Sequence, residues 1–166
     1  MHSSEEQERI VSELSLSRSP ETLYFLWSQT GDEDAQREFL QMEGSPKLET
    51  AEMQYALATF YTNRNQEKTL QLLNHALELS GRSNINTEIF KSLASTYYKE
   101  NQRELAYIWA KVAESFEIQI VSDKELQLLY GFNKEKFQKL DAIADDVEEM
   151  VRAGKYMQSS LPTKFD

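Results

Sequence analysis

The chain has 166 residues, a formal net charge of −10 and no cysteine. This length suits one domain with its own hydrophobic core, and the lack of cysteine excludes disulfides, thiolate metal sites and cysteine nucleophiles. The acidic excess disfavours nucleic acid and anionic membranes as partners, and no apolar run is long enough to span a bilayer, so we expect neither nucleic-acid binding nor direct membrane insertion by this chain.

Three helices are predicted in the first part of the chain, each introduced by a capping residue. A capping box at residues 4–7 opens a short amphipathic helix. Ser19-Pro20 starts the next helix, with serine as the N-cap and proline in the first turn, and Gly31 ends it. Asp32 caps the third helix, which is predicted to end at Gly44.

Two helical hairpins are predicted in the middle of the chain. The first joins a helix at residues 47–63 to one at 66–79, and a polar linker at 81–86 follows. The second spans about residues 87–116 and turns at 99–102, a polar stretch between two helices that each have an apolar face. Its second helix carries small side chains that let neighbouring helices approach closely, at Ala106, Ala110 and Ala113.

The last part of the chain predicts a short helix and a long one. Ser122 caps the short helix, which ends at Gly131, and Asn133 caps the long helix, which reaches Arg152. Residues 155–166 are predicted to form a flexible tail. Because no stretch alternates polar and apolar residues for long enough to form a strand, the sequence predicts an all-α fold.

A leucine followed four positions later by an aromatic residue recurs along the chain. Each pair lies on the first helix of a predicted hairpin, and a period of this size is typical of stacked helical hairpins. The alternative is a compact bundle in which the spacing is coincidental. Successive leucines are 34, 36 and 33 residues apart in the pairs Leu23/Trp27, Leu57/Tyr61, Leu93/Tyr97 and Leu126/Tyr130.

At these positions the sequence resembles the tetratricopeptide repeat and its Sel1-like relatives. Aligned on Leu93, Ala94 falls on the small-residue position, Tyr97 on the aromatic position, and Ala106 and Ala113 on the two alanine positions. The resemblance implies a right-handed superhelical stack of about four helix–turn–helix hairpins with a long capping C-terminal helix. It divides a single helical-repeat domain at 1–154 into a weak unit at 20–44, better units at 51–80 and 87–116, and a terminal unit at 122–152.

The family's turn glycine is replaced in the two better units. Asn101 stands in its place in one unit and Asn65 in the other. Asparagine tolerates a left-handed backbone nearly as well as glycine, so both turns are expected to adopt it.

Two stretches, 23–29 and 54–61, are similar to a bacterial family of uncharacterised proteins that are often described as lipoproteins. In that family a lipid-attachment signal lies upstream of a region like this one. The resemblance implies a periplasmic, envelope-anchored protein, and without it we expect a cytoplasmic one. Since no function is established for that family, the function has to be inferred from the residues.

No pattern in the sequence predicts a catalytic residue, a cofactor or a metal site, so we expect no enzyme. His75 lies on a helix between polar neighbours and is interpreted as a solvated surface residue. No glycine-rich phosphate loop or nucleophile elbow is present. Acidic residues at 141–149 lie on the polar face of the last helix, although Asp145 and Glu149 at i,i+4 could attract a cation. A small hydrolase or a cation-binding enzyme is therefore kept as a remote alternative.

In the repeat family that the sequence resembles, the first helix of each hairpin lines a concave groove. Exposed rings there would supply contact area and lysines would attract a carboxylate, unless the same side chains fill space between neighbouring units. The carboxylate clamp of chaperone-binding repeats needs asparagine where this chain has Ser95, so that role is not expected. The predicted groove residues are Phe25, Tyr55, Thr59, Thr62, Lys91, Ser95, Tyr98 and Lys99.

The sequence therefore favours a non-enzymatic module that binds a peptide or helix of another protein in this groove. The acidic surface favours a basic partner. The alternative is a self-associating structural or assembly factor of the bacterial envelope, a homodimer whose last helix pairs with a second copy through Val147 and Val151.

Overall fold

The structure is a computed structural model that describes residues 5, 6, 9, 18–116 and 122–165. Within these residues the regular structure is helical and contains no strand, which confirms the all-α prediction for this part of the chain. The helix predicted after residues 4–7 lies outside the described residues, apart from 5, 6 and 9. The helices are α2 (Pro20–Thr30), α3 (Glu33–Gln41), α4 (Ala51–Tyr61), α5 (Gln66–Leu79), α6 (Glu88–Lys99), α7 (Arg103–Ser115), α8 (Asp123–Tyr130) and α9 (Lys134–Arg152), with short 3₁₀ turns η1 (Pro46–Leu48) and η2 (Gln158–Ser160).

Predicted capping residues set most of the helix starts. The Asp32 Oδ1 accepts a hydrogen bond of 3.0 Å from the Ala35 backbone N–H, and Ser19, Ser122 and Asn133 cap their helices in the same way. One start was predicted wrongly: α4 begins at Ala51 and not at residue 47. Thr50 caps α4 instead, because the residues before it form the separate turn η1 behind Pro46.

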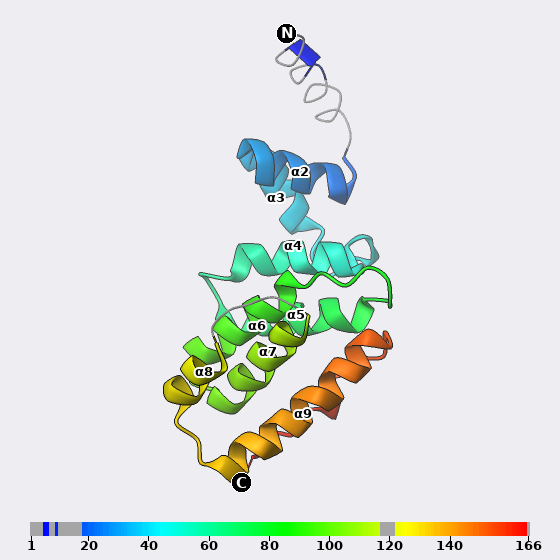
Figure 1. The fold of residues 1–166 in the computed structure, drawn as a ribbon. Helices are drawn as coiled ribbons and strands as arrows, with labels where there is room; N and C mark the ends of the chain where they lie inside the picture. The colour runs from blue at the N-terminus through cyan, green and yellow to red at the C-terminus, as the bar shows by residue number, and fades with distance from the viewer. Residues whose placement is uncertain (1–4, 7–8, 10–17, 117–121, 166) are drawn as a thin grey trace.

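Consecutive helices pair into hairpins. Helix α2 packs on α3, α4 on α5, and α6 on α7, and the hairpins follow one another along the molecule (Figure 1). Helix α5 packs on α6 and so links the second hairpin to the third. The terminal helices differ from these hairpins. Helix α9 packs mainly along α7, whereas the short helix α8 has only slight contact with α7.

The recurring leucine–aromatic pairs have a common structural role. All four leucines are buried. Tyr61 donates a hydrogen bond of 3.0 Å to Glu43, beyond the end of α3, Tyr97 accepts one of 3.2 Å from Asn74 of α5, and the ring of Tyr130 lies 5.5 Å from that of Tyr107 on α7. Each of these tyrosines thus reaches back to the preceding hairpin.

The two turn asparagines behave differently. Asn101 has φ = 58°, the left-handed conformation predicted for it. Asn65 has φ = −152°, so that prediction is wrong. Its side chain instead accepts a hydrogen bond from the Lys68 backbone N–H and caps α5, a role that needs an extended backbone.

The segment after α9 is packed on the molecule, in contrast to the predicted flexible tail at 155–166. Tyr156 is buried, with its ring 5.5 Å from that of Trp109, and Leu161 is buried in the same cluster. The Tyr156 hydroxyl donates a hydrogen bond of 2.6 Å to Asn74 Oδ1, while Asn74 Nδ2 donates to Tyr97 and to the Leu70 carbonyl. A buried asparagine therefore holds the segment, because its paired amide supplies an acceptor in the core.

None of the helices in the described part of the chain is both long enough and apolar enough to cross a lipid bilayer.

Candidate functional site

The predicted groove residues lie on the first helices of the three hairpins. Phe25 and Tyr98 are the exposed aromatic residues among them, with 42% and 47% of their surface accessible. Ring contacts within the described residues do not link these two side chains, which lie on α2 and α6. The remaining exposed members are Thr59 on α4 and Lys91, Ser95 and Lys99 on α6, whereas Tyr55 and Thr62 are partly buried.

Tyr55 fills space between helices. Burial raises the pKa of its hydroxyl, and the nearby Tyr24 of α2 and Glu88 of α6 raise it further. The partly buried side chain packs against the core cluster that includes residues of α5, α6 and α7. Its surroundings fit the alternative in which it packs between neighbouring units.

The hydroxyl groups of the predicted groove are bonded within their own helices. Thr59 donates to the Ala56 carbonyl at 2.6 Å, Thr62 to the Ala58 carbonyl at 2.8 Å, and Ser95 to the Ser92 carbonyl at 3.2 Å. Their oxygen atoms can still accept hydrogen bonds. The nearby donors are Lys91 and Lys99, and no carboxylate of the described residues lies within 4.0 Å of either ammonium group.

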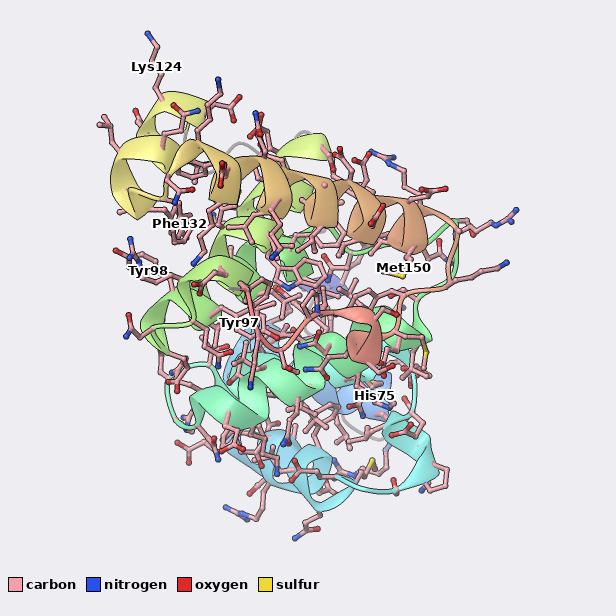
Figure 2. All side chains as sticks on the ribbon, turned by 90° about the horizontal axis from the view of Figure 1, so that it is seen from below. His75, Tyr97, Tyr98, Lys124, Phe132 and Met150 are labelled. Carbon is pink, nitrogen blue, oxygen red and sulfur yellow. The ribbon has the colours of Figure 1, made fainter. Side chains whose placement is uncertain are left out.

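Tyr98 begins a series of aromatic contacts that continues beyond the predicted site. Its ring lies edge-on to Tyr130 with centroids 6.0 Å apart, Tyr130 stacks on Phe132 at 5.7 Å, and Phe132 contacts Phe137 at 5.4 Å. These rings connect α6 to α8 and then to α9. Figure 2 shows Tyr98, Phe132 and Lys124 along one side of the molecule, while Tyr97 points into it.

The ring series leads to a hollow of about 700 Å³ between α8 and α9, which we call the terminal hollow. On its rim Leu128 is 84% exposed, the highest value among the large apolar residues that the structure describes as exposed. A hollow of this size can hold a large side chain with some of its neighbours. The terminal hollow is lined by Lys124, Gln127, Leu128, Phe132, Lys134, Phe137, Gln138 and Asp141.

The sequence contained a signal for this hollow that was not used. In the third hairpin, the groove residues were placed two before and two after the repeat leucine, and one and two after the repeat tyrosine. The same offsets from Leu126 and Tyr130 give Lys124, Leu128, Gly131 and Phe132. The three of these that carry a side chain line the terminal hollow. Carrying the groove rule into the fourth unit would therefore have found them.

The base of the terminal hollow is held by polar contacts. The Tyr107 hydroxyl donates a hydrogen bond of 2.6 Å to Asp141 Oδ1. Burial and this carboxylate both raise the pKa of Tyr107, so the hydroxyl stays protonated. Lys136 lies 4.9 Å from the centre of the Phe132 ring and bonds to Glu104 at 2.8 Å, which lowers the pKa of Glu104.

The cationic side chains around the terminal hollow differ in whether they already have partners within the protein. Arg103 lies 5.3 Å from the centre of the Phe132 ring and donates to the Leu129 and Tyr130 carbonyls. In contrast, no carboxylate of residues 18–116 or 122–165 lies within 4.0 Å of the ammonium group of Lys124 or Lys134. These two lysines are therefore the cations of the lining that remain able to pair with an incoming anion.

A larger hollow of about 900 Å³ lies between α5, the start of α7 and the C-terminal segment. The segment itself supplies much of its wall, including Met157, Gln158 and Leu161. The Gln158 backbone N–H donates to Glu78 at 2.9 Å across it. This larger hollow therefore lies along the boundary between the packed C-terminal segment and the helices α5 and α7.

His75 and part of the acidic run on α9 pair with other side chains of the described residues. His75 Nε2 lies 2.9 Å from Glu49 Oε2, just before α4, and its Nδ1 lies 3.7 Å from Glu78 Oε1 on α5, so the three side chains form a surface cluster. Of the acidic residues on α9, Asp141 bonds to Tyr107 and Glu148 bonds to Arg152. No group of three or more histidine, aspartate or glutamate side chains is placed to hold a metal ion in the part of the chain that the structure describes.

The two side chains considered for self-association are buried inside the protein. Val147 and Val151 are buried in the core cluster that includes α7. The prediction that these two side chains pair with a second copy is therefore wrong, because α7 covers them.

The fold and surface define a helical protein built from consecutive hairpins. Residues 1–111 match the model of DUF2989, a family of proteins of unknown function, and the chain belongs to this family. The match ends within α7, so the terminal hollow lies outside the matched residues. Membership in a family of unknown function agrees with that part of the sequence resemblance. No curated protein and no solved structure matches the chain.

Proposed function

We propose that this protein is a non-enzymatic interaction module that binds a peptide or a helix of another protein along its first helices. The observation that carries the proposal is the exposure of large apolar side chains on these helices, Phe25, Tyr98 and Leu128. Exposed apolar residues that cluster beside polar groups are typical of docking surfaces, where aromatic side chains contribute much of the binding energy.

The proposal includes a tetratricopeptide-like architecture. The repeated leucine–aromatic pairs, the three hairpins and the backward contact of each tyrosine support it. In this arrangement the hairpins form a right-handed superhelix with α9 as its cap, and the first helices line the concave surface. A place in the bacterial envelope, through a lipid anchor, belongs to the same proposal and is supported by the similarity of residues 23–29 and 54–61.

Two charge effects determine which partner the protein should prefer: its net charge acts during approach, and individual lysines act once the partner is bound. The net charge of −10 favours a basic partner during approach. Lys91 and Lys99 flank Tyr98 on α6 and favour a local acidic group once the partner is bound. Both effects act together only if the partner carries charges of both signs.

The proposal is tested by selecting binders from a displayed random-peptide library and measuring their affinity for the full chain by fluorescence anisotropy. We expect Tyr98→Ala to weaken the selected peptides about tenfold, since truncating an aromatic anchor removes 1 to 2 kcal/mol. Lys91→Ala should weaken peptides that carry an acidic group. Leu79→Ala is the matched control, because Leu79 is also exposed but lies on α5, a second helix.

Selected peptides that bind the Tyr98 and Lys91 variants as well as the unchanged chain would contradict the proposal. Loss of binding in the Leu79 variant alone would also contradict it, since that would place the binding surface on the second helices.

A further inference from the structure

The terminal hollow combines an apolar wall with a fixed base. Leu128 projects from α8. Phe132 faces the hollow from the turn before α9, and Phe137 faces it from the first turns of α9. Below them, Tyr107 is held both by Asp141 and by its ring contact with Phe137, whose centroid is 5.2 Å away. A base that is already ordered lowers the entropic cost of binding a side chain.

The charges around the hollow differ from those of the rest of the chain. The lining carries two lysines and one acidic residue, whereas the whole chain has 18 basic and 28 acidic residues. Asp141 is the acidic residue of the lining, and it already accepts a hydrogen bond from Tyr107. Lys124 and Lys134 are therefore left to attract an anion within a short, poorly screened distance.

We propose that the terminal hollow binds an internal segment of a partner protein in which one large apolar side chain is flanked by carboxylates. The apolar side chain packs against Leu128, Phe132 and Phe137, and the carboxylates pair with Lys124 and Lys134. This inference rests on the proposed function and names the chemistry that one end of the binding surface selects.

The form of the hollow favours an internal segment over a chain end. The rim at Leu128 is open to solvent, so a bound chain can continue past the hollow there, and lysines on two elements, Lys124 on α8 and Lys134 on α9, offer separate partners for the flanking carboxylates. Charge complementarity favours an acidic segment within a partner that is basic overall over a second copy of this chain, since two copies with a net charge of −10 repel each other.

The experiment uses the full chain and three synthetic peptides that are acetylated at the N-terminus and amidated at the C-terminus. One has a central phenylalanine flanked by glutamates, the second has glutamines in place of the glutamates, and the third has alanine in place of the phenylalanine. Binding is followed by anisotropy at two salt concentrations, and the site is located from the NMR shifts of leucine methyl groups. We expect the glutamate–phenylalanine peptide to shift the Leu128 methyl signals and to bind about fivefold more tightly than either control peptide.

Variants on the rim identify the contacts. Leu128→Ala should weaken the glutamate–phenylalanine peptide, and Lys124→Gln with Lys134→Gln should weaken it about fivefold and remove most of its salt dependence. Lys47→Gln is the matched control, because Lys47 is an exposed lysine of η1 that lies outside both the predicted groove residues and the lining of the terminal hollow. Thermal melting of each variant checks that the fold is kept.

Equal binding of the glutamate and glutamine peptides would overturn the inference, as would no binding, or methyl shifts confined to α5 and the C-terminal segment. Binding only to a peptide with a free C-terminal carboxylate would overturn the internal-segment form. Concentration-dependent dimerisation that Leu128→Ala abolishes would assign the hollow to a second copy instead. If library peptides depend on Tyr98 but not on Leu128 or Lys124, the proposed function stands and this inference fails. If they depend on none of these residues, both fail.

Discussion

The surfaces formed by the second helices and by the first helices are completed in different ways. On α5 and α7 the chain covers itself, because Tyr156 and Leu161 of the C-terminal segment are buried there and Asn74 pairs with the hydroxyl groups beneath. On α6 and α8, Tyr98 and Leu128 remain in contact with solvent. The comparison teaches that the C-terminal segment of the same chain covers apolar surface on the second helices, while on α6 and α8 large apolar side chains stay accessible to another molecule.

The largest loss of stability should come from removing a side chain by which the C-terminal segment packs on α5 and α7. Tyr156→Ala removes the ring beside Trp109 and the hydrogen bond to Asn74. We expect the free energy of unfolding to fall by about 4 kcal/mol, because the substitution leaves a cavity in the core. Urea denaturation measures the change. Met157→Ala is the matched control: the adjacent side chain is exposed, and its removal should change stability by less than about 0.5 kcal/mol. Equal stability of the two variants would show that the segment is not part of the core.

A smaller effect should follow from removing the polar link alone. Asn74→Ala leaves the hydroxyl groups of Tyr97 and Tyr156 without their partner, and we expect a loss of about 2 kcal/mol. Tyr156→Phe should remove part of the same interaction. In a double-mutant cycle the combined loss should therefore be smaller than the sum of the single losses. Full additivity would contradict the contact between these side chains.

A pH titration examines the ring contact at the edge of the open surface. Burial raises the pKa of Tyr130 to about 12, and the neighbouring Tyr98 adds to the shift. The folded state thus holds the Tyr130 proton more tightly than the unfolded chain does. This stabilisation is fully present below the ordinary pKa of 10.0 and is lost as the pH rises towards about 12. Tyr98→Ala opens one side of Tyr130 and should lower its pKa, measured by tyrosinate absorbance. An unchanged Tyr130 pKa would contradict the contact between the two rings.

The smallest effect on stability should come from the open surface itself. Leu128→Ala should change the free energy of unfolding by less than about 0.5 kcal/mol, because the removed atoms were already in water. Thermal melting of the variant measures this. A loss above about 1 kcal/mol would mean that Leu128 serves the fold and would remove it from the binding surface.

Much of the helical layout could be predicted from local sequence. The bounds of α5 follow from its apolar periodicity, and the starts of α8 and α9 follow from Ser122 and Asn133, whose capping bonds involve neighbours three residues away. Short-range chemistry of this kind is visible in the sequence. The start of α4 was missed because Pro46 also suits a helix start, but it begins the separate turn η1, and Thr50 caps α4.

The docked C-terminal segment could not be predicted in this way. Tyr156 is 82 residues from Asn74 along the chain. Asn74 is a polar residue in the middle of a helix, where a pattern of apolar residues gives no reason to bury it. Long-range pairing through a buried polar group leaves no local signal.

The candidate site was predictable only in part. The repeat offsets identified the exposed Tyr98 and Phe25, but they also selected Tyr55, whose partial burial depends on neighbours from other hairpins. The hollow between α8 and α9 depends on where α9 lies, which the repeat pattern does not specify. Its rim residues on α8 were nevertheless within reach of the same rule.

The most direct test of the difference between the two surfaces is NMR mapping of the full chain with a peptide selected from a random library. We expect the backbone amide signals of α6 and α8 to move on titration and those of α5 and the C-terminal segment to stay in place. Shifts centred on α5, α7 and the C-terminal segment, with α6 and α8 unaffected, would contradict the proposal that the first helices form the binding surface.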